Sequence, residues 1–447
     1  MKEALSKSKL DYIFYHLNRH VDLKDLSGFF IFDLSEKQPN KPFILFRKSD
    51  KKLTKNFSIN DIPVLYPLSE EKSFFSFDNA YNLLFNHDLL KSAFFLLSGF
   101  QETLPFNGDH MGRFAYDDSI QKELGIAEKP IVNIYFSIII DAFEQFCQKH
   151  NLQMNKRNYW DDKEYGFLLT HDVDRVDKWT SMEFKKRIKM VIKSGFTKHW
   201  KYFWESLKHF KSNENPYWNF EWMKKLETEK GFKSTWFFLP EGHRLIDAWY
   251  SFDEPRIKQL AAFFQRSGDS IGMHATFLSK EDKNVMADNL KAVQKLVENK
   301  VIISRQHWLN FKYPQTLRNL EELGIRYDSS WGFSGNIGWR NSYCLPFRAY
   351  DIEQDQMMDI WELPLAVMDV TLFQYMGLSL KQAEERLLKL IETCRKYNGF
   401  LVLLWHNSHF DETLIPGITA FYQSLLDHIS DSPQKPLSLN DIVTITS

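Results

Sequence analysis

GFLLTHDVD, the stretch from Gly166 to Asp174, is an apolar run that ends abruptly in charged residues. A short apolar run of this kind is typical of a strand buried on both faces of a parallel sheet. Because side chains alternate along a strand, Asp172 and Asp174 are predicted to project to one side at its carboxyl end. Two neighbouring carboxylates repel each other, so the pair predicts a metal, a proton or an arginine beside it. A single Asp here would more often cap a turn, which remains the alternative interpretation.

Three further apolar runs end in the same way. His274 follows the run 270–273, Arg305 and His307 follow 301–304, and His406 follows 401–405. If these strands are parallel, their carboxyl ends meet at one edge of the sheet, where active sites of α/β proteins are built. Together with the Asp pair, these side chains supply the groups that metal-assisted hydrolysis needs.

From about residue 160 onward, apolar runs alternate with amphipathic segments, which indicates a parallel α/β architecture. The clearest helix is predicted over 379–397, where Ser379 and Gln382 form a capping box, and another over 281–298. We therefore expect an α/β fold in which 159–447 form a distorted or incomplete (β/α) barrel. The predicted strands of this barrel are 166–170, 234–239, 270–273, 301–304, 326–329, 360–365, 400–405 and 442–445.

Residues 1–158 have a different pattern and predict a smaller α+β amino-terminal domain, joined to the barrel by a polar linker at 153–163. The role of this domain is not indicated by its residues. Its predicted strands are 29–32 and 43–46, and its predicted helices are 79–85, 88–97 and 132–149.

Composition excludes several classes of protein. The 57 Lys and Arg nearly balance the 58 Asp and Glu, so the chain offers no basic excess for nucleic acid. Its three cysteines form no Cys-x-x-Cys motif, so a metal must be held by His and carboxylates. Charges interrupt the first twenty residues and no apolar run is long enough to span a membrane, so we expect a cytoplasmic protein.

One segment departs from this balance. Residues 178–211 hold ten Lys or Arg against two Glu, with aromatic residues between them. Such a segment could be a helical insertion that makes weak contact with a membrane surface, or a solvated helical excursion whose aromatic residues pack on the barrel.

The motifs resemble those of the NodB-homology polysaccharide deacetylases of carbohydrate esterase family 4, in a bacterial branch with an additional amino-terminal domain. The resemblance covers about residues 165–430 and rests on Thr170 to Asp174, His274, Arg305, and Leu404 to Asn407. A weaker match in the amino-terminal part lies around FFLLSGFQE (94–102) and residues 111–114. The resemblance implies a hydrolase that removes acetyl groups from N-acetylated sugars with a divalent metal, most often Zn²⁺ and sometimes Co²⁺ or Ni²⁺.

Residue by residue, the resemblance implies that Asp172 is the general base, that Arg305 pairs with it, and that His406 is the general acid. It also implies that Asp174 and His274 bind the metal. The motif departs from the family at Leu278, which stands where the second metal-binding His of a His-x-x-x-His motif is expected.

His307 lies two residues after Arg305, on the same side of an extended strand, and is the candidate third metal ligand. The alternative is that His307 supports a metal ligand from behind or contacts substrate, without binding the metal itself. We also expect Asp328, Trp339 and Arg340 to bind substrate, because they flank a loop rich in Gly, Ser and Asn, although packing of Trp339 against the barrel is an equal alternative. Asp369 is expected to orient His406.

The sequence thus predicts a metal-dependent N-deacetylase whose partner is an N-acetylated sugar or glycan precursor. Two alternatives stay open. One is a catalytically degenerate glycan-binding or scaffold protein, in which loss of the second His has abolished metal binding. The other is an O-acetyl esterase on the same fold.

Overall fold

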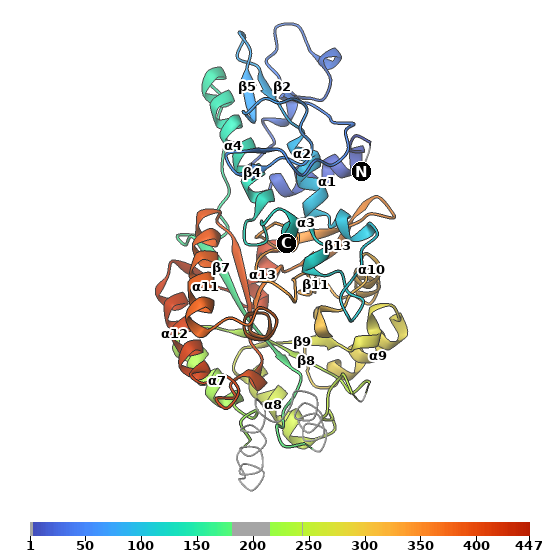
Figure 1. Cartoon of the computed structure of the whole chain (residues 1–447), viewed down its shortest axis with the longest axis vertical. Helices are drawn as coiled ribbons and strands as arrows, with labels where there is room; N and C mark the ends of the chain where they lie inside the picture. Colours follow the sequence, from blue (N-terminus) through green and yellow to red (C-terminus); the bar gives the residue numbers. More distant parts are fainter. Residues whose placement is uncertain (1–2, 181–214, 244) are drawn as a thin grey trace.

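The computed structural model describes residues 3–180, 215–243 and 245–447 (Figure 1). The predicted basic insertion therefore lies outside the described residues, apart from 178–180, and its contact with membranes stays a prediction. The described residues form a ten-stranded main sheet, a four-stranded sheet and a two-stranded hairpin.

The main sheet has the strand order β12-β13-β11-β10-β9-β8-β7-β15-β14, and β16 pairs with the first residues of β7. All neighbours along this order run parallel except β12 and β13. Because β12 and β14 are its outer strands, the sheet is open, which agrees with an incomplete barrel. Its strands are β7 Tyr165–Val173, β8 Ser234–Phe238, β9 Ser270–Ala275, β10 Ile303–Gln306, β11 Tyr327–Asp328, β12 Phe347–Asp351, β13 Gln356–Glu362, β14 Leu365–Met368, β15 Phe400–Leu404 and β16 Gln434–Pro436.

Strand β7 lies third from the β14 end of this sheet, and all nine of its residues are buried. It pairs with β15 along one edge and with β8 along the other. Because its side chains alternate between the two faces and all are buried, both faces of the sheet are covered here. Arg305 of β10 lies directly opposite His274 of β9 in the parallel register. The carboxyl ends of these strands therefore share one edge of the sheet.

Helices connect most of these strands and cover the sheet (Figure 1). Helix α11 confirms its predicted cap, because the Ser379 side chain accepts from the backbone N–H of Gln382, whose side chain in turn accepts from Ser379 N. The helices are α7 Phe220–Glu229, α8 Pro255–Arg266, α9 Lys283–Gln294, α10 Gln315–Glu322, α11 Leu380–Lys396, α12 Ile418–Asp431 and α13 Leu439–Thr446.

The amino-terminal region, drawn from blue to teal in Figure 1, lies beyond one end of the main sheet. Its four-stranded sheet has the order β1-β2-β6-β5, in which only β5 and β6 pair antiparallel. The elements are α1 Lys7–Leu17, β1 Phe30–Ile31, β2 Ile44–Phe46, β3 Ser58–Ile59, β4 Ile62–Pro63, β5 Phe75–Phe77, β6 Leu83–Phe85, α2 Leu89–Leu97, α3 Ile120–Glu123 and α4 Ile131–His150.

Two sequence predictions give the wrong kind of element, and the strand predicted over 360–365 is divided between the end of β13 and the start of β14. The helix expected over 79–85 is a turn followed by β6, because Asp78 Oδ1 accepts from the backbone N–H groups of Ala80 and Asn82 and so closes the turn. The strand expected over 442–445 belongs to α13, whose start is fixed by a capping box between Ser438 and Asp441.

One continuous cluster of buried apolar side chains extends through the amino-terminal region and the main sheet. A buried ion pair also joins them, since Glu102 Oε2 lies 2.5 Å from Arg340 Nη2. The domain boundary at 158/159 therefore stays a prediction. Among the described residues, no helix combines the length and the apolar character needed to cross a bilayer.

Candidate active site

Asp172 projects from the end of β7 toward the neighbouring strands, as the alternation of side chains predicts. Its Oδ1 accepts from Arg305 Nη1 at 2.9 Å, and Arg305 also donates to Thr170 Oγ1 at 3.0 Å. His171, which lies between Thr170 and Asp172 in the sequence, is on the other face of the strand, where its Nε2 is 3.0 Å from Glu227 Oε1. The Asp pair therefore shares one face of β7, and the buried guanidinium balances the charge of Asp172.

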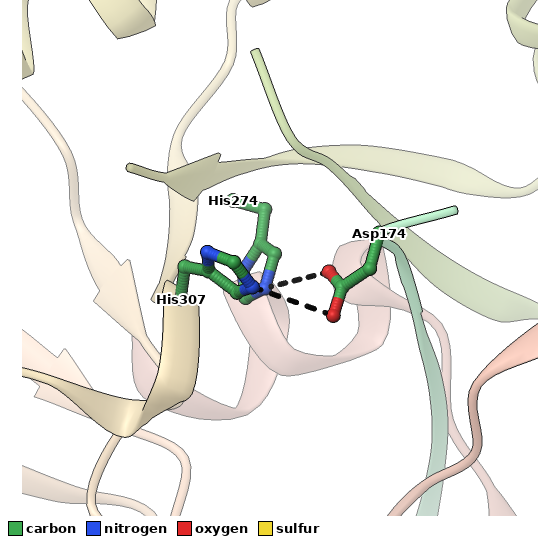
Figure 2. A group of neighbouring side chains, drawn as sticks. All are labelled: Asp174, His274 and His307. Carbon is green, nitrogen blue, oxygen red and sulfur yellow. Dashed lines mark ion pairs between the residues drawn. The ribbon is translucent and has the colours of Figure 1, made fainter. Parts of the chain in front are cut away.

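Asp174, His274 and His307 come from three different strand ends and converge (Figure 2). His274 Nε2 lies 3.2 Å from Asp174 Oδ1, and His307 Nε2 lies 3.5 Å from Asp174 Oδ2. One potential ligand atom from each residue falls within 4.8 Å of the others. Two imidazoles and a carboxylate, with room for water, form a donor set that suits a catalytic zinc ion.

The other nitrogen of each imidazole is held in place. His274 Nδ1 donates to the carbonyl oxygen of Arg305 at 2.9 Å, and His307 Nδ1 donates to Asp247 Oδ1 at 3.0 Å. Both hydrogen bonds favour the tautomer that leaves Nε2 with a free lone pair directed at Asp174. Metal-binding histidines are oriented by hydrogen bonds of this kind.

Asp174 Oδ1 provides a test of whether a cation fits. This buried oxygen receives no hydrogen bond from the described residues, although His274 Nε2 is close to it. Burial opposes its charged form, but His307 and His274 hold the pKa of the Asp174 carboxyl well below its usual range. Burial likewise opposes charge on His307, but Asp174 and Asp247 raise its pKa. Without a metal these groups are stabilised by protons, which a divalent cation would displace.

His406 follows β15 and faces both carboxylates, with its Nε2 3.9 Å from Asp172 Oδ2 and 3.8 Å from Asp174 Oδ2. Its Nδ1 donates to Asp369 Oδ1 at 2.7 Å, the hydrogen bond expected from the sequence. Burial favours the neutral imidazole, but Asp369, helped by Asp174 and Asp172, outweighs it and raises the pKa of His406 to about 9. The second oxygen of Asp369 lies 3.1 Å from His409 Nδ1.

A cavity of about 200 Å³ opens above these residues. Five of the six residues predicted to be catalytic or metal-binding line it, and the sixth, Arg305, lies behind Asp172. Its lining is Arg113, Asp172, Asp174, Arg175, His274, His307, Trp308, Leu309, Ser334, Met368, Val370, Gln374, Tyr375, His406, Ser408 and His409.

The three residues predicted to bind substrate do not line this cavity, and their role stays a prediction. Trp339 is fully buried in the core, and Arg340 is held by Glu102. Asp328 is also fully buried, where Ser304 Oγ donates to its Oδ1 at 2.6 Å. Trp339 and Arg340 are buried because their loop contacts the amino-terminal region, where Trp339 N donates to the carbonyl oxygen of Ala127 and Arg340 pairs with Glu102. Asp328 is buried because it belongs to strand β11 inside the main sheet.

Leu278, at the position of the missing histidine, belongs to the short helix η5 Phe277–Lys280, and 57% of the residue is exposed. It is not among the residues that line the cavity. Position 278 therefore contributes no side chain to the cavity. His307, which directly follows β10, lies close to Asp174 instead.

Sequence analysis missed three residues of the site. Asp247, which holds His307, stands in an irregular segment without periodicity, and nothing in the sequence marks it. His409 stands only three residues after His406, a spacing that could have marked it as a second imidazole near Asp369. Arg113 belongs to the weakly matching stretch 111–114 and lines the cavity from the amino-terminal region.

Comparisons with known proteins found one family model and several solved structures. Residues 5–148 match the model of a family of unknown function, DUF7033. No curated protein matches the chain. Among solved structures, the probable polysaccharide deacetylase from Pseudomonas aeruginosa PAO1 is 13% identical, with a TM-score of 0.44 over 64% of this chain and 91% of that one.

Two other solved structures widen the comparison. PuuE allantoinase is 13% identical, with a TM-score of 0.43 over 65% of this chain and 93% of that one. A CE4 family pseudoenzyme from Bacillus anthracis is 9% identical, with a TM-score of 0.29 over 64% of this chain and 66% of that one.

Proposed function

We propose that this protein is a metal-dependent hydrolase that removes the acetyl group from an N-acetylated sugar or glycan precursor. The observation that carries the proposal is the convergence of Asp174, His274 and His307 on one point, beside a carboxylate and an imidazole suited to proton transfer. Zn²⁺ is the proposed ion, because it prefers tetrahedral sites of imidazole and carboxylate ligands, and Co²⁺ or Ni²⁺ could replace it.

In this proposal Asp174, His274 and His307 hold the ion, which when bound would lower the pKa of water and polarise the acetyl carbonyl. Asp172 acts as general base and accepts the proton of the attacking water. Arg305 holds Asp172 by the 2.9 Å hydrogen bond to Oδ1, which leaves Oδ2 on the cavity side, 3.5 Å from His274 Nε2. The base is therefore fixed in orientation before substrate binds.

His406 acts as general acid and donates its Nε2 proton to the departing sugar amine, which is too basic to leave as an anion. Its raised pKa of about 9 keeps the imidazole protonated at neutral pH. Asp369 receives the Nδ1–H and fixes the ring so that Nε2 faces the cavity. Acid and base thus lie side by side, with His406 Nε2 3.9 Å from Asp172 Oδ2, and each has its own charged partner.

Metal analysis together with Asp174→Asn tests the proposal. We expect purified protein to bind about one Zn²⁺ per chain, and the variant to lose both the ion and the release of acetate from an N-acetylglucosamine oligomer. Asp253→Asn is the matched control, because that side chain is 98% exposed and lies outside the cavity.

Three outcomes separate the alternatives. Protein that binds no divalent metal at any pH, but still binds the oligomer, would make it a glycan-binding module and would overturn the hydrolase proposal. Acetate release from O-acetylated but not N-acetylated sugars would indicate an esterase. In that case His406→Ala should retain most activity, because an alkoxide depends less on an acid than an amine does.

A further inference from the structure

Three residues of the cavity lining, Arg113, Trp308 and Tyr375, come from separate parts of the chain and are here called the cavity rim. Arg113 comes from the amino-terminal region, Trp308 follows β10, and Tyr375 ends the π-helical segment η7 Thr371–Tyr375. Trp308 and Tyr375 are the aromatic residues of the lining, apart from its histidines, and each is 39% exposed. Large aromatic side chains left accessible in a cavity mark a surface that a ligand can cover.

Arg113 is oriented within its own loop before it reaches the cavity. Asp109 Oδ1 accepts from the backbone N–H groups of Met111 and Arg113, and Gly112 supplies the positive φ of 73° that closes the turn. Asp109 Oδ2 then lies 2.7 Å from Arg113 Nε and 2.5 Å from Nη2. Asp109 therefore fixes the Nε and Nη2 side of the guanidinium. The remaining nitrogen, Nη1, is directed at Trp308.

At the rim Arg113 holds both aromatic residues. Its Nη1 donates to the carbonyl oxygen of Trp308, and its Nη2 lies 3.5 Å from Tyr375 Oη. The backbone of Trp308 has φ of 65° and that of Leu309 has φ of 52°, a left-handed conformation that residues other than glycine rarely adopt. Such a conformation persists only where surrounding contacts hold it, and Arg113 provides one of them.

The position of this turn connects the rim to the chemistry. Trp308 directly follows His307, whose Nε2 faces Asp174. The indole is therefore placed next to the candidate metal ligands by a backbone that Arg113 holds from the amino-terminal region. A pyranose ring has an apolar face of C–H groups and a periphery of hydroxyl groups, which match exposed aromatic faces beside charged donors.

We propose that the amino-terminal region completes the active site, with Arg113 as a positioning residue that fixes Trp308 and Tyr375 as a binding subsite for a pyranose ring. This inference rests on the proposed function, which places the acetylated sugar in the same cavity. It gives the region matched by the family of unknown function a definite task, that of forming one wall of the substrate cavity.

Binding of N-acetylglucosamine tetramer to the metal-free full-length chain tests the proposal, measured by tryptophan fluorescence or calorimetry. We expect Arg113→Lys, which keeps the charge but loses the planar fork, and Trp308→Ala each to weaken binding about tenfold or more. Arg157→Lys and Tyr81→Phe are matched controls outside the cavity, and each should change binding less than twofold. With metal bound, Arg113→Lys should raise KM more than it lowers kcat.

Unchanged tetramer affinity in both Arg113→Lys and Trp308→Ala would overturn the proposal. If Arg113→Lys does not fold, Trp308→Ala and Tyr375→Phe decide, because both rim aromatics are well exposed. The outcomes also separate this inference from the proposed function. A chain that binds metal and releases acetate but has no rim-dependent sugar affinity refutes only the subsite, whereas rim-dependent binding without acetate release refutes only the deacetylase.

Discussion

The strand-end cluster and the cavity rim face the same cavity but are built differently. The cluster consists of Asp172, Asp174, His274, Arg305, His307 and His406, whose side chains are at most 8% exposed apart from Asp174 at 20%. The rim consists of Arg113, Trp308 and Tyr375, whose aromatic members are 39% exposed. The difference teaches that the candidate reacting groups are held on or just after regular strands, whereas the residues proposed to bind the sugar stand outside the strands.

The largest effect should come from the base of the cluster. Asp172→Asn keeps an acceptor for Arg305 but cannot take up a proton, so we expect kcat to fall about 10³-fold. Metal content should stay at the wild-type level, because Asp174, His274 and His307 remain. Acetate release and metal analysis on the same sample check this, with Asp253→Asn as the exposed control. Equal loss of metal and activity would show that Asp172 is itself a ligand.

A smaller effect is expected behind the cluster, at Asp247. Its carboxylate fixes the ring of His307 through the 3.0 Å hydrogen bond to Nδ1, and loss of such an orienting partner typically weakens metal binding about 10- to 100-fold. Asp247→Asn should therefore raise the Kd for Zn²⁺ by roughly that factor in a chelator competition. Wild-type affinity would show that His307 does not bind the metal.

The pH dependence should reveal the acid. A general acid works only while protonated, so activity should decline as pH rises through the pKa of His406, which is about 9. Asp369→Asn removes the carboxylate that raises this pKa while burial still lowers it, so the decline should move to lower pH. At pH 8 we expect kcat roughly tenfold below wild type, with the acidic side of the profile unchanged. A profile identical to wild type would contradict the acid role of His406.

The smallest effect is expected at Leu278, where the family motif would have a histidine. The side chain is 57% exposed and does not line the cavity, and His307 already faces Asp174. Leu278→His should therefore change the Kd for Zn²⁺ less than about twofold, measured by the same competition. A large gain in affinity would indicate that the site lacks a ligand and that His307 has another role.

The strand-end cluster could be predicted from the sequence because the residues obey a local rule. An apolar run marks each buried strand, and the residue after it must lie at the shared edge of a parallel sheet, as Asp172, His274 and His406 do. The capping box at Ser379 is likewise a local signal, and it marks the start of α11.

The rest depends on contacts between distant segments. Asp247 reaches His307 across 60 residues, and Arg113 reaches Trp308 across 195. Trp339 and Arg340 carry residue types typical of a sugar site, yet packing against the amino-terminal region buries them. The β-branched residues of 442–445 favour a strand, but tertiary packing and the capping box make that segment a helix.

The ion pair between Glu102 and Arg340 has a consequence for how related chains diverge. These residues stand 238 positions apart, and both side chains are at most 4% exposed. Replacing either one alone would leave a buried charge unmatched, which costs about 3–5 kcal/mol, whereas exchanging both for apolar side chains could be nearly neutral. Positions 102 and 340 should therefore covary among related chains, which either keep both charges or have lost both.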